Sequence, residues 1–258
     1  MNQISNVGIY QFLAEPFHCD FTKHLFYGHL GNHLLNAADY HSDDRDFGMR
    51  YLMPIHKTWV LSRLVIEMNE MPLAYDQFYV ETWVDSVIKF FTSRNFKITD
   101  GSDKVYGYGK STWVMIDTDS RKPTNILDVK DGVILQYLET QKECPIDPVS
   151  RVNVKHQPQM VKTINTHYSD VDMNGHINSV KYMEHVLDLW DVNWYCKYHV
   201  QRMEIAYSAE AHGGDQLKLY VEEVNVTEFR VSIYKINNEK TDETEVCRSR
   251  VVFAENQS

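Results

Sequence analysis

Apolar positions in the first half of the chain predict one helix and five strands. Leucine and alanine residues recur at helical spacing over 28–40, so a helix is expected there. Apolar, aromatic and β-branched residues concentrate in shorter segments that are typical of strands. These segments are 7–13, 58–68, 78–84, 94–98 and 105–117. The expected order is a short strand, a helix, and then a meander of long antiparallel strands.

The second half of the chain repeats this order. A helix is expected at 175–191, and Asn237 and Asn238 indicate a hairpin turn. The expected strands are 161–168, 200–207, 216–224, 228–236 and 246–254. Apolar residues occur around most of the circumference of the expected helix, as in a helix wrapped by a sheet. We therefore predict an α+β tandem (double) hot-dog fold, in which each half is a long helix wrapped by a curved antiparallel sheet.

Two prolines mark the boundary between the halves. Pro145 and Pro148 interrupt the chain after the last expected strand of the first half. The expected domains are 1–143 and 153–258, joined by a linker over 144–152. With 258 residues, 43% of them hydrophobic, each half is large enough to bury a core of its own.

Charge and cysteine content limit the classes of function. The 36 acidic and 26 basic residues give a net charge of −10, which disfavours nucleic-acid binding because that requires a basic surface. The four cysteines lie far apart and form no CxxC pair, so reduced thiols are expected. No apolar run approaches the roughly 18 residues of a membrane span, and no targeting pattern is recognisable. We expect a soluble, cytoplasmic protein with no nucleic-acid partner and no membrane span.

A polar segment of the second half has a partial copy in the first. Placing the Gly-His dipeptide at 28–29 on the one at 175–176 aligns the two segments at an offset of 147 positions. This alignment puts Leu25 opposite Asp172. The first copy is therefore expected to lack the carboxylate.

A second pairing supports the duplication. Residues 63–76 align with 202–215 at an offset of 139, which puts Met71 opposite Glu210. Because the offsets differ, about eight extra residues are expected between the paired segments of the first half. Each pairing replaces a carboxylate by an apolar residue in the first half. The pattern predicts a duplicated fold with a non-catalytic first half and one chemical site in the second.

The candidate catalytic residues are Asp172, Asn174, His176 and Glu210. The first three alternate along the chain just before the expected helix, whose first N–H groups could polarise a carbonyl. Simpler roles are also open. Asp172 or Asn174 could be a helix N-cap, His176 a structural histidine, and Glu210 a solvated residue at a strand end.

Two neighbouring residues are candidates for substrate binding. Gly175 would allow close backbone approach, and Asn178, expected one turn into the helix, would be a hydrogen-bonding or structural residue. No metal and no cofactor are expected. His24, His29 and His33 share a possible helical face, but no acid or cysteine was found to complete a metal set.

The chain resembles the fatty acyl-acyl carrier protein (ACP) thioesterases, the plant-type family with bacterial relatives, over nearly its whole length. The most specific match is 168–182, which is similar to the family's Asp-x-Asn-x-His segment. Further matches are 59–81, Trp83 and 113–116. The resemblance implies two fused hot-dog domains, with acyl-chain binding largely in the N-terminal domain. It also implies hydrolysis of the acyl-ACP thioester, releasing free fatty acid, in the C-terminal domain.

Carried over by motif, the site would consist of Asp172, Asn174, His176 and Glu210. The plant enzymes have a Cys directly after the Glu, whereas this chain has Ala211, so a Cys–His mechanism at that position is excluded. The carboxylates then remain as the reactive groups. Asp172 would act as a general base on water or as a direct nucleophile.

Three alternatives remain open beside acyl-ACP hydrolysis. These are an acyl-CoA thioesterase, a non-catalytic acyl-binding hot-dog protein and a hot-dog dehydratase. ACP is acidic and needs a local basic patch, for which Arg45, Arg50 and Lys57 are candidates. Acyl chain length is not predictable from the sequence, and both a monomer and a homodimer are compatible with it.

Overall fold

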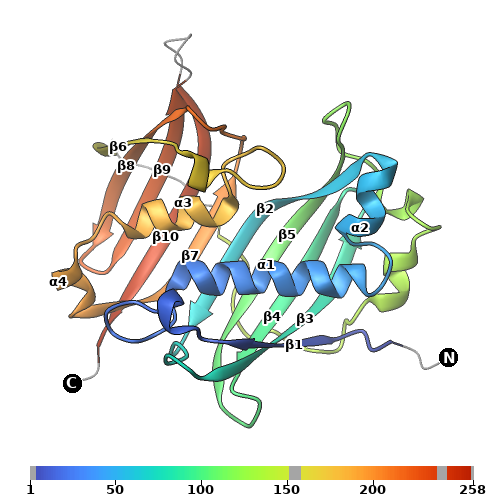
Figure 1. Cartoon of the computed structure of the whole chain (residues 1–258), viewed down its shortest axis with the longest axis horizontal. Coiled ribbons are helices and arrows are strands. Elements are labelled where there is room, and N and C mark those ends of the chain that lie inside the picture. The colour runs from blue at the N-terminus through green and yellow to red at the C-terminus, as the bar shows by residue number, and fades with distance from the viewer. Residues whose placement is uncertain (1–3, 151–157, 237–242, 257–258) are drawn as a thin grey trace. The chain divides into compact units, whose positions relative to one another are not determined.

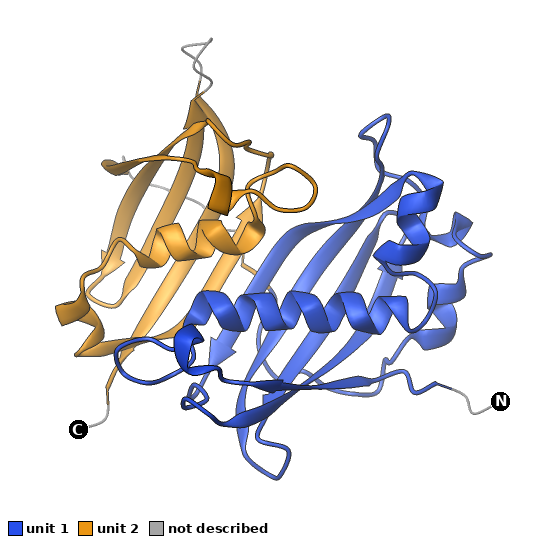
Figure 2. Ribbon diagram, viewed as in Figure 1, with its two compact units in different colours: residues 1–148 blue, residues 149–258 orange. Residues whose placement is uncertain are grey.

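The chain forms two compact units that divide between Pro148 and Val149, inside the expected linker (Figure 2). The computed structural model describes residues 4–150, 158–236 and 243–256. Each unit has its own helix and its own antiparallel sheet (Figure 1). Within the described ranges, no helix is long and apolar enough to cross a membrane.

The first unit places a 17-residue helix, α1 (Tyr27–Asp43), across a five-stranded sheet. The strand order is β1-β3-β4-β5-β2, and every neighbouring pair is antiparallel. The strands are β1 (Gly8–Leu13), β2 (Lys57–Met68), β3 (Gln77–Ile88), β4 (Phe91–Thr99) and β5 (Val105–Asp117). A short helix, α2 (Met49–Leu52), follows α1. All five expected strands are confirmed.

The helical spacing seen in the sequence explains how α1 packs. Leu30, Leu34 and Ala37 are fully buried on one face of the helix. From one face of β3, Phe78 and Val80 are also fully buried, and the ring of Phe78 contacts that of His33 in α1. Burying one such large apolar side chain contributes about 1.5–3 kcal/mol. This core fixes α1, and the turn that leads into it, on the sheet.

The second unit repeats the architecture with a shorter helix, α3 (Ser179–Leu187). Its sheet has the antiparallel order β7-β10-β9-β8-β6. The strands are β6 (Gln159–Asn165), β7 (Tyr198–Tyr207), β8 (Gln216–Asn225), β9 (Glu228–Ile236) and β10 (Glu243–Glu255). A short helix, α4 (Val192–Tyr195), follows α3. The predicted α+β tandem hot-dog fold is confirmed, while Asn237 and Asn238 lie outside the described residues.

The expected bounds of the second helix were wrong at both ends. Gly175 has a φ of 82°, which is incompatible with a right-handed helix. Asn178 is the N-cap rather than a residue one turn inside, because its side-chain oxygen accepts the N–H of Val180 at 3.0 Å. The apolar periodicity continues beyond Leu187, but the helix does not.

The repeat of the segment before each helix was also placed in the wrong register. The N–H of Asp20 donates to the carbonyl of His24 at 2.9 Å, and that of Asp172 donates to His176 at 2.8 Å. The offset between equivalent positions is therefore 152, not 147. Residues 28–29 lie in the first turn of α1 and do not correspond to 175–176. The first unit retains both the aspartate and the histidine of this turn.

The central residues of the two turns match in the same register. Thr22 and Asn174 each donate a backbone N–H to the side chain of the preceding aspartate of their unit at 2.8 Å. Lys23 and Gly175 both have positive φ, at 67° and 82°. The two units thus fold this segment into the same turn with different side chains.

The second expected pairing is correct. The carbonyls of Pro72 and Ala211 each accept a backbone N–H at 2.8 Å from the residue two places before their unit's helix. This confirms the offset of 139 and the correspondence of Met71 with Glu210. With offsets of 152 and 139, the first unit has thirteen extra residues between the two segments, not eight. Met71 is therefore the apolar replacement that the structure supports.

Candidate active site

The candidate residues come from two loops of the second unit. The first loop runs from the 3-10 turn at Tyr168–Asp170 to α3 and is closed at its base by a bridge between Val171 and Ile177. The second loop follows β7 and contains Glu210. The bond from the N–H of Ile177 to the carbonyl next to Glu210 joins the two loops. This bond brings segments about 35 residues apart in sequence into one site.

Asp172 organises the first loop. One carboxylate oxygen, Oδ1, accepts the backbone N–H of Asn174 at 2.8 Å and that of His176 at 3.2 Å. This is an Asx-type turn, which precedes the helix rather than capping it. The alternative in which Asp172 or Asn174 caps the helix is therefore wrong, since Asn178 is the cap.

His176 and Glu210 form an acid–imidazole pair across the two loops. Nε2 of His176 lies 3.2 Å from Oε2 of Glu210, with side-chain exposures of 22% and 36%. A carboxylate at this distance orients the imidazole ring. Both groups remain accessible to water. The pair can therefore take a proton from a bound water molecule and return it.

The first unit does not have this pair at the equivalent positions. Met71 replaces the glutamate, and Nδ1 of His24 lies 3.0 Å from Oγ1 of Thr22. That hydroxyl donates in turn to the carboxylate of Asp20 at 2.6 Å. The turn is conserved between the units, but its histidine contacts a hydroxyl instead of an acid.

The structure explains Gly175 differently from the sequence. A Cβ at this position would meet no atom of the protein within 4 Å, so close packing does not require glycine. The positive φ favours glycine, because L-residues rarely adopt it, although Lys23 does so at the equivalent position of the first unit. Asn174 and Gly175 are both exposed at the tip of the loop. Their side of the turn is therefore accessible to a ligand.

His212 is a neighbour of the pair that the sequence analysis missed. Its ring lies edge-on to that of His176, with centroids 5.1 Å apart and an interplanar angle of 71°. Nδ1 of His212 is 3.9 Å from a carboxylate oxygen of Asp215. The sequence places it two residues after Glu210, but its contact with His176 depends on how the two loops pack.

The residue directly after Glu210 is an alanine and not a cysteine. Ala211, directly after Glu210, is fully buried. Cys247 of the same unit is also fully buried, and burial raises the pKa of its thiol, which disfavours the nucleophilic thiolate. The chemistry that these side chains support is acid–base activation of water.

Family models match both units. The model described as the acyl-ACP thioesterase N-terminal domain matches residues 10–132, and the one described as the acyl-ACP thioesterase C-terminal domain matches residues 153–255. Oleoyl-acyl carrier protein thioesterase of Coriandrum sativum is 30% identical over 145 residues. That match covers 52% of this chain and 38% of the plant protein, so the chain spans about two fifths of that relative's length.

Solved structures match over nearly the full chain. An acyl-ACP thioesterase from Bacteroides thetaiotaomicron is 44% identical, with a TM-score of 0.85, and the match covers 96% of this chain and 98% of that one. The 12:0-ACP thioesterase from Umbellularia californica has a TM-score of 0.82 at 17% identity. That match covers 99% of this chain and all of that one, and it shows likeness of fold alone.

Proposed function

This chain belongs to the acyl-ACP thioesterase family, and we propose that it hydrolyses the thioester of acyl-ACP to release free fatty acid. The observation that carries the proposal is the pair formed by His176 and Glu210 at 3.2 Å. His176 lies on a turn that both units share, but the glutamate is present only in the second unit. This difference between the units supports a catalytic second unit.

The mechanism we propose uses water as the nucleophile. The His176–Glu210 pair takes a proton as water attacks the thioester carbonyl, and the tetrahedral intermediate then expels the pantetheine thiolate. The same pair returns the proton to that sulfur. The exposed side-chain amide of Asn174 is proposed to hydrogen-bond the carbonyl oxygen. Gly175 and Asn178 contribute indirectly, by shaping the turn and capping α3.

In this mechanism Asp172 is a positioning residue. Asp20 holds the same turn in the unit that lacks the glutamate, so this carboxylate has a folding role that needs no catalysis. In the alternative assignment, Asp172 is the general base or the nucleophile, and His176 and Glu210 position the water or stabilise charge. Substitutions at Asp172 distinguish the two mechanisms.

The first unit is proposed to bind the acyl chain without catalysing. The loop after β2 carries Met71 in place of the glutamate, which supports a non-catalytic role. For the carrier protein, Arg45 is unsuitable because it is only 3% exposed and donates to the carbonyls of Ser5 and His41. Arg50 is exposed and remains a candidate contact. The cytoplasmic location and the choice between monomer and homodimer stay predictions.

Comparing carriers tests the proposal. The purified full chain is assayed with acyl-ACP and acyl-CoA of equal acyl length, and both free acid and enoyl product are quantified. We expect free acid, with a higher kcat/KM on acyl-ACP. A higher value on acyl-CoA would favour the acyl-CoA thioesterase, and enoyl product would indicate a dehydratase. Binding without turnover of either substrate would make the chain an acyl-binding protein.

A further inference from the structure

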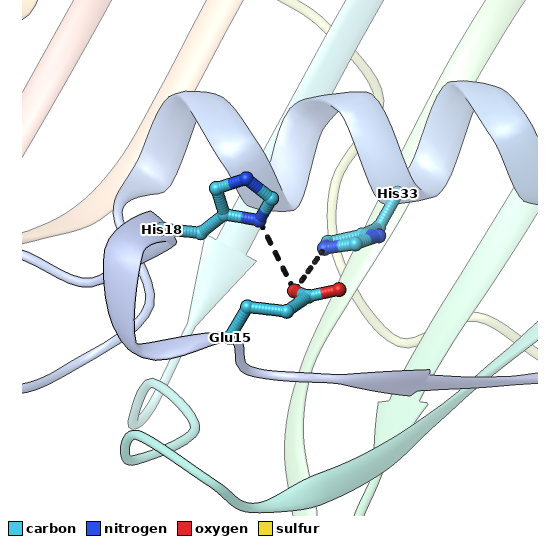
Figure 3. Close-up of side chains that lie close together, drawn as sticks. All are labelled: Glu15, His18 and His33. Carbon is cyan, nitrogen blue, oxygen red and sulfur yellow. Dashed lines mark hydrogen bonds and ion pairs between the residues drawn. The ribbon is translucent and has the colours of Figure 1, made fainter.

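Three side chains of the first unit, which does not contain the proposed active site, converge on one another (Figure 3). Glu15 is the N-cap of the 3-10 turn at Pro16–His18, His18 is the last residue of that turn, and His33 projects from α1. Nδ1 of His18 is 3.1 Å from Oε2 of Glu15, and Nε2 of His33 is 3.9 Å from the same oxygen. Of the histidines considered in the sequence, His24, His29 and His33, only His33 belongs to this group. Its neighbours here are Glu15 and His18.

We propose that Glu15, His18 and His33 bind a first-row divalent metal ion, with Zn²⁺ as the preferred ion. Their potential ligand atoms all lie within 4.8 Å of one another. Tetrahedral zinc with bonds of about 2.0–2.2 Å places neighbouring ligand atoms about 3.4 Å apart. The two observed distances bracket that spacing, so small side-chain movements suffice. Two imidazoles and one carboxylate also suit Zn²⁺ better than Mg²⁺ or Ca²⁺, which favour oxygen ligands.

The ligand side chains are held in place by the fold. The N–H of His18 donates to the carbonyl of Glu15 at 2.8 Å, which fixes the turn between them. The ring of His33 packs against Phe12, with centroids 4.6 Å apart, and edge-on against Phe78 at 5.4 Å. Side chains ordered in this way lose little conformational freedom when a metal binds.

The exposure of the cluster also suits binding. Glu15 and His18 are each 42% exposed, which gives an ion a path of entry and leaves a coordination position for water.

The second unit also has two histidines and one acid at the equivalent positions, but in a different order. His167, Asp170 and His185 correspond to the three ligands at the offset of 152. There the N–H of His167 donates to Asp170 at 2.7 Å, and the two residues form a capping box. Over the described ranges, only the Glu15, His18 and His33 group gathers three potential ligands. His185 is therefore the matched control for His33.

The role of the ion would be to tether the turn before α1 to the middle of that helix. An ion that binds the folded unit and not the unfolded chain stabilises the folded unit by mass action. This role is independent of thioester hydrolysis, so the proposal does not depend on the proposed function.

The test titrates ZnCl2 into the full chain after chelator treatment, by calorimetry, with Co²⁺ absorption as a spectroscopic probe. We expect one ion per chain, a visible Co²⁺ band of the tetrahedral type, and a Tm that rises with zinc. E15Q and H33Q should each weaken zinc affinity at least tenfold and abolish the Co²⁺ band. The control, H185Q, should bind zinc as the wild type does.

Several outcomes would overturn the proposal. These are a wild-type chain that binds no stoichiometric zinc, E15Q and H33Q variants that bind as well as wild type, or zinc binding that is lost in H176N instead. Circular dichroism checks that each variant is folded. Should a variant not fold, hydrogen exchange of the wild type decides: zinc must slow exchange in the segment around His18 for the proposal to stand.

Discussion

Asp20 and Asp172 hold the same turn in the two units, each accepting at 2.8 Å the backbone N–H of the residue two places further along. Only the turn of Asp172 presents its histidine to a glutamate. The backbone geometry is thus common to both units, and the difference that bears on chemistry lies at Glu210 and its counterpart Met71.

Replacing Glu210 by glutamine should lower kcat on acyl-ACP by about 10²–10⁴-fold, the usual contribution of a general base. The stability should change little because the side chain is partly exposed. E184Q is the matched control, since Glu184 is another partly exposed acid of this unit, paired with Lys181 at 2.6 Å. An E210Q variant that turns over at the wild-type rate would remove the pair from the mechanism.

Two substitutions at Asp172 distinguish a positioning role of this carboxylate from a catalytic one. Asparagine keeps an oxygen that can accept the two N–H groups of the turn, whereas alanine removes it. We expect D172N to retain at least about a tenth of the wild-type kcat, and D172A to lose much more because His176 is no longer held.

D20A provides the control for D172A. It removes the same turn-forming carboxylate from the first unit, and a cost of about 1–3 kcal/mol in the free energy of unfolding is expected from both alanine variants. Only D172A should impair turnover. If D172N is as inactive as E210Q, Asp172 is the reacting carboxylate and the His176–Glu210 pair has the positioning role.

Gly175→Ala should destabilise the chain by about 1 kcal/mol, because alanine at a φ of 82° is strained although its Cβ meets no neighbour. The reverse change, Lys23→Gly, should cost nothing or stabilise slightly, since Lys23 already has a φ of 67°. Urea denaturation of the two variants measures both effects. Equal stability of G175A and wild type would show that the turn tolerates a side chain there.

His41 should make the chain sensitive to acid. Burial, with Arg94 and Arg45 adding to it, lowers the pKa of His41 to about 2, so the ring stays neutral in the folded chain. In the unfolded chain it binds a proton below about pH 6.5, and stability is therefore lost as the pH falls below that value. Its Nε2 lies 2.9 Å from the carbonyl of Asn6.

The measurement for His41 is urea denaturation at pH 7 and pH 5. On going to the lower pH, the wild type should lose about 2 kcal/mol more of its free energy of unfolding than H41Q does. The comparison uses the change with pH, so a constant cost of the substitution cancels. The same pH dependence in both proteins would assign the acid sensitivity to other groups.

The strands were predictable because apolar and β-branched residues mark them directly. The segment expected at 105–117 is β5 to the residue, and the one expected at 58–68 is β2 without its first residue. The start of α3 was missed because periodicity continues through apolar residues that precede the cap. Asn178 carried the cap signal, and the positive φ of Gly175 ends the turn before it.

The repeat was misaligned because the Gly-His dipeptide was given more weight than the Asp-x-x-x-His spacing that begins at Asp20 and at Asp172. The shared Gly-His dipeptide is more conspicuous than the match of Lys23 with Gly175, which have only their positive φ in common. The contact of His212 with His176 and the convergence of Glu15 with His33 depend on tertiary packing. Spacing along the chain does not encode such contacts.

The intact turn around Asp20 separates folding from chemistry. The first unit has the backbone bond between Asp20 and His24 and the bond from the N–H of Thr22 to Asp20, yet it carries Met71 where the second unit has Glu210. Different side chains of one repeated motif therefore determine the fold of the turn and the acid–histidine contact. In mutational terms, the first copy differs from an acid–histidine arrangement by a change at position 71 and a reorientation of the imidazole of His24.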